Sequence, residues 1–135
     1  MARQTYIGLP VKDLAKATEF FTRLGFARNE DASDESSSGM VINDATMLML
    51  HAEPYFEQFT QSEIADPSTA REVTLGLSAD SRQEVDELAE RPVAASGRAV
   101  GDSVSQGPMY MRAFLDPDGH RWSVIHVDMS GTVGR

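Results

Sequence analysis

Apolar and polar residues alternate in two stretches of the chain, residues 5–11 and 73–79. The apolar positions are Ile7, Leu9 and Val11 in the first stretch and Val73, Leu75, Leu77 and Ala79 in the second. In the first stretch Tyr6 and Gly8 occupy the opposite face. Alternation with a period of two predicts strands that are buried on one side only.

Each predicted strand is followed by a predicted helix. Asp13 and Ser81 can cap helix N-termini, and Glu84 completes a capping box with Ser81. Apolar residues then recur at helical spacing, at Leu14, Ala17, Phe20, Phe21 and Leu24 and at Val85, Leu88 and Ala89. Gly25 is placed to end the first helix, and Pro92 is expected to end or kink the second at the preceding residue.

The two strand–helix patterns are 68 residues apart (73 − 5 and 81 − 13). This offset predicts a β-α-β-β-β unit that is written twice, and hence an α+β fold in one domain, 1–135. We place module 1 at about 1–51, a connector at 52–71 with a short helix near Phe56, module 2 at about 72–128 and a tail at 129–135.

Turn residues complete the predicted outline. The polar residues 30–39 predict a solvated loop, and residues 40–51 predict a hairpin around Asn43-Asp44. The sequence Asp116-Pro117-Asp118-Gly119 predicts a four-residue hairpin connection, because proline presets φ and glycine tolerates a positive φ. Formation of this turn explains Asp116 and Asp118 without a catalytic role.

Composition narrows the functional classes. The 135 residues include no cysteine, which excludes disulfides, thiolate nucleophiles and thiolate metal sites. The formal net charge of −9 argues against nucleic-acid binding and suits either a cationic ligand or simple solubility. No apolar run approaches the roughly 20 residues of a membrane span, and the N-terminus lacks a signal-peptide core. A cytoplasmic location is therefore expected.

The opening motif Leu9-Pro10-Val11-Lys12-Asp13-Leu14 and the closing motif of residues 114–122 (Phe-Leu-Asp-Pro-Asp-Gly-His-Arg-Trp) together resemble the vicinal oxygen chelate superfamily. This superfamily includes glyoxalase I, bleomycin-resistance proteins and extradiol dioxygenases. The resemblance implies mixed sheets that form a cup with helices outside, and a homodimer in which the partner completes the cup. In the metalloenzymes of the superfamily, four strands supply ligands to a divalent ion.

The four family ligand positions fall on Tyr6, Met49, Thr74 and Ser123. Phenol, thioether and aliphatic hydroxyl groups are poor ligands for a divalent ion that prefers imidazole and carboxylate. Moving the alignment by one residue gives no better set. We therefore expect no metal site at these positions.

Without a metal, the same positions are expected to line an apolar cup that carries a few hydroxyl groups. The expected lining residues are Tyr6, Met47, Met49, Thr74 and Ser123. If the last hairpin pairs Phe114 with Arg121, Tyr110, Arg112 and Phe114 share the face of Ser123. Arg112 would then be a fixed cation able to bind a carboxylate or phosphate, or would pair with a surface acid; both interpretations stay open.

Three histidines remain to be placed. His120 is expected to be exposed after the turn, and His126 to share a strand face with Trp122. His51 shares a face with Met49 and is the best candidate to reach the cup. Structural or solvent-exposed roles are favoured over a site built from all three.

Two functions follow from this resemblance and these residues. The first is a metal-independent protein that binds a small organic molecule in the apolar cup at a dimer interface. The alternative is a glyoxalase I-like (lactoylglutathione lyase-type) or other metal-dependent enzyme, with a divalent ion at a relocated site. Metal-free catalysis by Tyr6, His51 or Arg112 has no positive support in the sequence, so enzymatic activity and catalytic residues are left open.

Overall fold

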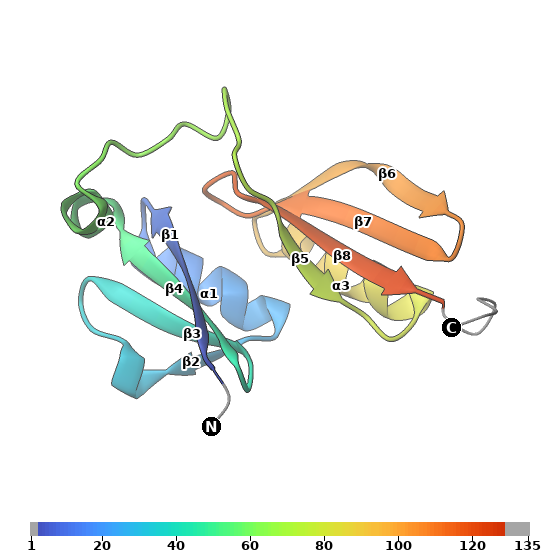
Figure 1. The fold of residues 1–135 in the computed structure, drawn as a ribbon, viewed down its shortest axis with the longest axis horizontal. Coiled ribbons are helices and arrows are strands. Elements are labelled where there is room, and N and C mark those ends of the chain that lie inside the picture. The colour runs from blue at the N-terminus through green and yellow to red at the C-terminus, as the bar shows by residue number, and fades with distance from the viewer. Residues whose placement is uncertain (1–2, 129–135) are drawn as a thin grey trace. The chain divides into compact units, whose positions relative to one another are not determined.

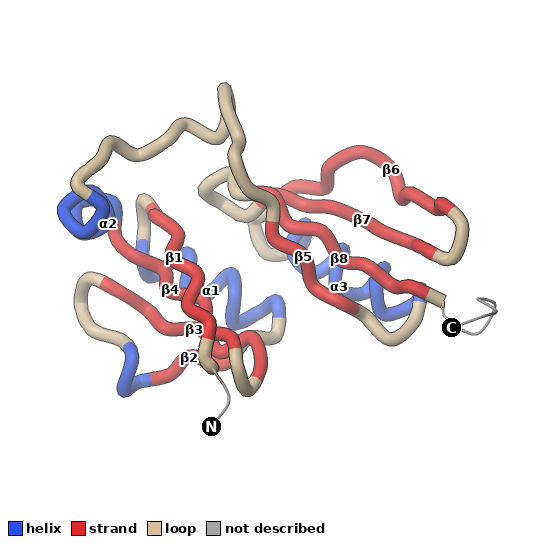
Figure 2. Tube along the Cα trace, viewed as in Figure 1, coloured by secondary structure: helices blue, strands red, loops and turns tan. Residues whose placement is uncertain are grey.

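Each half of the chain builds its own four-stranded mixed sheet with a helix across one face (Figure 1). The computed structural model describes residues 3–128 and consists of unit 1, Met1–Ala70, and unit 2, Arg71–Arg135. The distribution of helices and strands along the chain is shown in Figure 2. The predicted tail, 129–135, lies outside the described residues.

Unit 1 forms a sheet with the strand order β1-β4-β3-β2. Its elements are β1 (Thr5–Val11), α1 (Leu14–Leu24), β2 (Ala27–Asn29), the 3-10 helix η1 (Glu30–Ala32), β3 (Ser37–Asn43), β4 (Thr46–Ala52) and α2 (Glu53–Thr60). β1 runs parallel to β4, and the other neighbours are antiparallel. The predicted helix near Phe56 is confirmed as α2.

The core of unit 1 lies between α1 and the sheet. The apolar face of α1 is fully buried at Ala17, Phe20, Phe21 and Leu24, and it faces the buried strand residues Leu9, Val11, Met40, Leu48 and Leu50. Asp13 caps the helix by accepting a hydrogen bond from the Lys16 amide, and Gly25 ends it with φ of 123°. The helical spacing and both end signals in the sequence are therefore confirmed.

Unit 2 repeats this plan with the strand order β5-β8-β7-β6. Its elements are β5 (Leu75–Ser78), α3 (Arg82–Ala94), β6 (Arg98–Gln106), β7 (Met109–Leu115) and β8 (Arg121–Val127). β5 is parallel to β8, as β1 is to β4. The helix caps Asp13 and Ser81 are 68 residues apart (81 − 13), which confirms the duplicated unit.

The cap of α3 differs in one detail from the predicted capping box. Ser81 Oγ accepts a hydrogen bond from the Glu84 amide at 3.0 Å, as expected. The Glu84 carboxylate, however, accepts from the amide of Asp80, one residue before the cap.

Two local predictions are wrong. The expected end of α3 at Arg91 is wrong, since the helix continues to Ala94 with Pro92 in its last turn. There the proline removes one amide donor, while its own carbonyl accepts hydrogen bonds from the Ala95 and Gly97 amides. The loop predicted for 30–39 is also not solvated throughout, since β3 begins at Ser37 and buries Ser37 and Ser38.

Asp116 organises the connection between β7 and β8. One of its carboxylate oxygens accepts from the amides of Asp118 and His120, both at 3.0 Å. The other accepts from His120 Nδ1 at 2.9 Å and from the indole Nε1 of Trp122 at 3.1 Å. The connection therefore spans five residues, 116–120, rather than the predicted four. His120 is held in this network and is not the exposed side chain that we expected.

The described helices of both units are short. None of them is long and apolar enough to cross a membrane.

Candidate functional site

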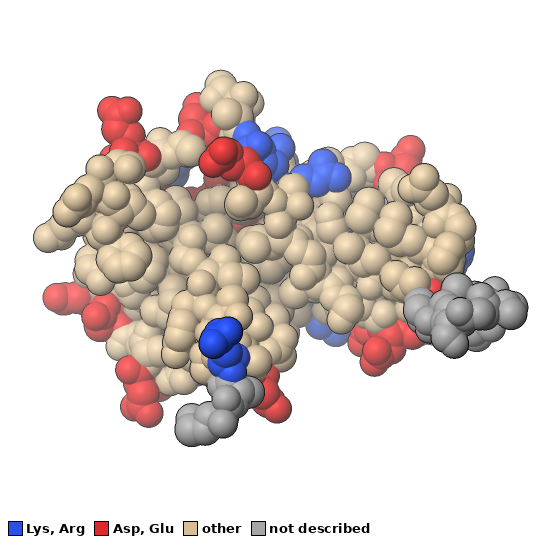
Figure 3. All heavy atoms as spheres, in the orientation of Figure 1, with Lys and Arg blue, Asp and Glu red and all other residues tan. Residues whose placement is uncertain are grey.

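The face of the first sheet that α1 leaves open collects the cup residues predicted for module 1. β1 presents Tyr6 beside Met47, and β4 continues with Met49 and His51 on the same face. Tyr6 is 66% exposed, and the two methionines are half-buried. The surface over the middle of these strands is uncharged in Figure 3, with mostly acidic side chains around its edge. The sequence therefore placed these four residues correctly on one face.

His51 occupies one end of this face in an aromatic setting. Its ring centroid lies 5.3 Å from that of Tyr55, 6.2 Å from that of Phe56 and 5.9 Å from that of Phe59, all on α2. His51 Nδ1 and Ser37 Oγ share a hydrogen bond of 2.7 Å. Burial lowers the pKa of His51 below its ordinary value, which the negative charge of Asp34 partly opposes. His51 is thus favoured in its neutral form.

Two glycines determine how closely neighbouring groups approach this face. Gly8 and Gly39 lie opposite Met49 on either side of β4. A Cβ on Gly8 would stand 3.4 Å from the His51 ring, which is ordinary contact. A Cβ on Gly39 would stand 2.8 Å from the Ala32 Cβ, so only glycine fits there without a shift.

The open face of the second sheet carries a hollow of about 490 Å³. It is lined by Arg71, Glu72, Val73, Thr74, Met111, Arg121 and Ser123. The structure thus brings together Thr74 and Ser123, the two expected cup residues of module 2. It also adds two arginines that we had not selected.

Tyr110, Arg112 and Phe114 lie on the opposite, helix-covered face, so their predicted placement beside Ser123 is wrong. In the observed register Phe114 pairs with Trp122 and not with Arg121. The connection held by Asp116 contains one residue more than predicted, and a shift of one residue moves every side chain to the other face of a strand.

Arg112 is instead engaged by the acids of α3. Its Nη1 lies 3.2 Å from a carboxylate oxygen of both Asp86 and Glu90. Tyr110 donates a hydrogen bond of 2.7 Å to Asp86, which together with Arg112 lowers the pKa of Asp86. Of the two interpretations left open for Arg112, the structure therefore supports pairing with surface acids.

The remaining histidines have structural partners. His126 Nδ1 donates to the Ala79 carbonyl at 3.0 Å, and His120 bonds Asp116. Among residues 3–128, no three His, Asp or Glu side chains are grouped so that they could hold a metal ion.

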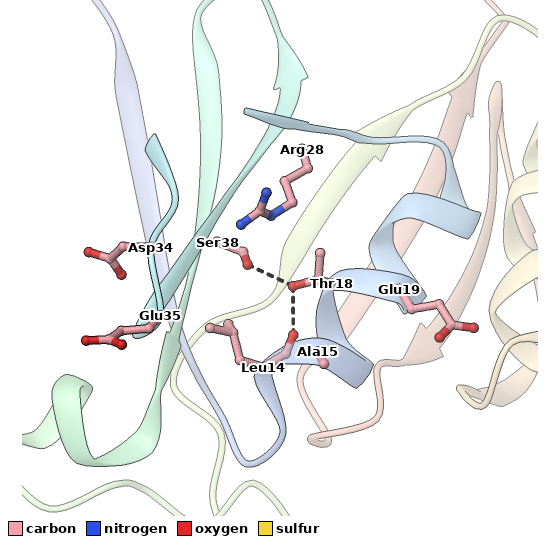
Figure 4. Close-up of a pocket in the computed structure, with 8 residues that line it drawn as sticks. All are labelled: Leu14, Ala15, Thr18, Glu19, Arg28, Asp34, Glu35 and Ser38. Atoms are coloured by element: carbon pink, nitrogen blue, oxygen red, sulfur yellow. Dashed lines mark hydrogen bonds between the residues drawn. The ribbon is translucent and has the colours of Figure 1, made fainter. Parts of the chain in front are cut away.

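A second hollow, of about 510 Å³, lies beside α1 in unit 1 (Figure 4). It is lined by Leu14, Ala15, Thr18, Glu19, Arg28, Asp34, Glu35 and Ser38. Figure 4 shows Arg28 extending toward Ser38 and Thr18. These groups already have partners: Thr18 contacts Ser38 and the Leu14 carbonyl, and Arg28 pairs with Glu30. This hollow is therefore a weaker candidate than the open faces.

A family model of the glyoxalase/bleomycin resistance protein/dioxygenase superfamily matches residues 3–124. The chain belongs to this superfamily. The resemblance seen in the opening and closing motifs is thereby confirmed. No protein among those with curated functions matches the chain by sequence.

Solved structures support the superfamily fold over most of the chain. A hypothetical protein from S. aureus has a TM-score of 0.81 at 26% identity, covering 93% of this chain and 94% of that one. A superfamily enzyme from Burkholderia phytofirmans has a TM-score of 0.80 at 18% identity, covering 93% and 99%. A fosfomycin resistance protein from Listeria monocytogenes has a TM-score of 0.67 at 21% identity, covering 98% and 96%.

The metal implied by some members of the superfamily does not fit the residues found here. The family ligand positions place Tyr6 and Met49 on the open face of unit 1, and Thr74 and Ser123 on that of unit 2. A phenol, a thioether and two aliphatic hydroxyls do not provide the imidazole or carboxylate ligands that hold a divalent ion. We therefore assign no metal-dependent step to these positions.

Sequence reasoning missed Ser37, Arg71 and Arg121. Ser37 was assigned to a polar loop, and nothing in its neighbourhood signalled a buried partner for His51. Arg121 was recoverable, because it alternates with Trp122 along the strand and therefore lies on the same face as Ser123. Arg71 lies before the first strand of unit 2, where the pattern gives no direction for a side chain.

Proposed function

We propose that the protein is a metal-independent member of its superfamily that binds a small organic molecule against the open sheet face of unit 1. One observation carries this proposal: aromatic and apolar side chains are left uncovered on unit 1. Tyr6 is 66% exposed, Phe59 68% and Tyr55 39%. Large apolar side chains that are exposed together on one unit are more typical of a binding site than isolated exposed residues are.

The side chains of this face suit a ligand of irregular, partly aromatic shape. Met47 and Met49 are unbranched and polarizable, so they can adapt to different shapes. The rings of Tyr55 and Phe59 are stacked with centroids 6.1 Å apart, which provides a flat apolar wall on α2. Nε2 of His51 makes no hydrogen bond within the described residues. No fully buried side-chain nitrogen or oxygen in those residues lacks a hydrogen-bond partner, so Nε2 is not fully buried. It therefore keeps access to solvent and is available to a polar group of the ligand.

The proposal includes the apolar cup and the homodimer that the superfamily resemblance implies. A partner subunit would cover part of the exposed aromatic surface and enclose the ligand. Analytical ultracentrifugation tests this part directly. A dimer that is weakened by Phe59→Ser would support the role of α2 in closing the cup, whereas a protein that is monomeric at all concentrations would contradict it.

Nile red, a neutral apolar dye, is a suitable probe because the natural ligand is not identified. We expect saturable binding to the wild-type protein. Tyr6→Ser and Phe59→Ser should each weaken it about fivefold, since partial burial of an aromatic ring contributes about 1 kcal/mol. Val104→Ser is the matched control, because Val104 is a 41% exposed apolar residue on the edge strand β6. Equal affinity in all four proteins would refute the proposal.

Elemental analysis separates this proposal from the metal-dependent alternative. The protein is equilibrated with divalent ions, desalted and analysed. We expect well under one metal ion per subunit. A value near one would overturn the metal-independent proposal, and it would direct attention to a relocated site near His51 and Asp34 in a glyoxalase I-like or other metal-dependent enzyme.

A further inference from the structure

We infer that the hollow on the open face of unit 2 is an anion-binding site, in which Arg121 and Arg71 bind the carboxylate, phosphonate or phosphate group of a small organic molecule. The anion site stands on its own residues. Only the assignment of the anion to an organic ligand depends on the function proposed above.

Arg121 is the centre of this inference. It begins β8 and lies two residues before Ser123, so both side chains project from the same face of the strand. Among the described residues no carboxylate lies within ion-pair distance of Arg121. The chain contains 21 acidic residues against 12 basic ones. An arginine that lines a hollow without an acidic partner, in a chain so rich in acids, is therefore available to an external anion.

Arg71 lines the same hollow and is fixed at one point. Its Nη2 donates a hydrogen bond of 3.2 Å to the Gly119 carbonyl, in the connection that precedes Arg121. This bond ties the guanidinium to the rigid turn held by Asp116. A guanidinium carries five N–H groups in a planar fork, so it can bind more than one partner at a time.

Small residues make room beside Ser123. Ser123 lies between Gly76 on β5 and Ala113 on β7. A Cβ on Gly76 would meet only the Cδ1 of Ile125, at 3.6 Å, so the space above the β5 backbone is open. An anion held by the arginines can therefore approach the sheet closely enough to accept hydrogen bonds from the hydroxyls of Ser123 and Thr74.

The charge of the lining residues favours an anion locally. The hollow contains two arginines and one acid, Glu72, which gives a local net charge of +1. The whole chain carries −9. A monoanionic or dianionic group is therefore attracted to the lining of this hollow, although the chain as a whole is acidic. The neighbouring Val73, 65% exposed, and Met111 offer apolar contact to the organic part of a ligand.

The site is tested with phenylphosphonate and benzoate as anionic probes, inorganic phosphate as the anion alone, and benzyl alcohol as a neutral analogue. Titrations are followed by calorimetry and by the Nε–H resonance of Arg121 in ¹H–¹⁵N spectra. We expect Arg121→Gln and Arg71→Gln each to weaken phenylphosphonate binding at least tenfold (about 1.4 kcal/mol), without changing the affinity for benzyl alcohol. Arg121→Lys keeps the charge and should retain part of the affinity, because the ammonium cannot bind in a forked geometry.

Arg98→Gln is the matched control, since it removes the same charge from an exposed arginine at the start of β6. An unchanged affinity in Arg121→Gln, or an equal loss in Arg98→Gln, would overturn the inference. Phosphate that fails to shift the Arg121 resonance would do the same, even if Nile red still binds as proposed above. Conversely, phosphate binding through Arg121 without any binding of Nile red would refute the apolar ligand and leave the anion site standing.

Discussion

Asp116 offers the sharpest test of how the fold positions the second open face. Its carboxylate is 4% exposed and accepts four hydrogen bonds. Replacement by Asn keeps one oxygen, which can still accept from the two backbone amides of the connection. The new NH2 group would face the His120 Nδ1–H and the Trp122 indole N–H, so donors would oppose donors.

The expected loss of stability can be worked out from these two bonds. Trp122 is 1% exposed, so its indole N–H would be buried without a partner, at a cost of about 1–3 kcal/mol. Loss of the His120 bond to an ionised carboxylate adds a similar amount. We therefore expect Asp116→Asn to reduce the free energy of unfolding by about 3 kcal/mol. For a unit of this size the melting temperature should fall by more than about 10 °C.

Urea unfolding followed by tryptophan fluorescence measures this effect in the right place, because Trp122 is the single tryptophan of the chain. Asp102→Asn is the control: it removes the same charge from an exposed position on β6 and should change stability by less than about 0.5 kcal/mol. If Asp116→Asn costs less than about 1 kcal/mol, or no more than the control, the carboxylate does not hold the connection and our account of the register is wrong.

Two further predictions concern unit 1. Because burial lowers the pKa of His51, its midpoint in an NMR titration should lie below about 6.5. As the pH drops through about 6.5, the unfolded chain binds the proton before the folded one does, so the free energy of unfolding should fall. His51→Gln should remove this dependence, whereas a titration above 6.5 would contradict it. Gly39→Ala should cost about 1–3 kcal/mol, since its Cβ would lie 2.8 Å from the Ala32 Cβ and 2.9 Å from the Met47 sulfur. Gly8→Ala, whose Cβ would make ordinary contacts with the His51 ring at 3.4 Å and Phe56 at 4.0 Å, should be nearly neutral in the same urea titration.

The architecture was predictable because its signals are local and independent. The alternation of β1, the cap at Asp13 and the glycine at residue 25 each specify one feature, and all three agree. The 68-residue repeat then extends the same interpretation to unit 2, whose helix begins after Ser81. A strand or helix that is predicted from a period of two or 3.6 residues is still identified correctly when its predicted end is wrong by one residue.

The site was less predictable because it depends on tertiary partners. The bond between Ser37 and His51 joins residues 14 apart on neighbouring strands, within a segment whose composition suggested only a polar loop. The aromatic rings around His51 come from α2, which the sequence located but could not orient. Neither contact leaves a periodic signal in the chain.

The faces of the last hairpin show how one residue decides the chemistry of a site. Counting a four-residue connection placed Arg112 on the open face as the cation, and the five-residue connection held by Asp116 places it against Asp86 on α3 instead. The same shift leaves Arg121, rather than Arg112, on the face of Ser123. A cation on that face was one of the two interpretations left open for Arg112, and the observed register places Arg121 there instead. It follows that a substitution at Asp116 that shifts the register of β7 against β8 would change both the stability of unit 2 and which arginine lies on the open face.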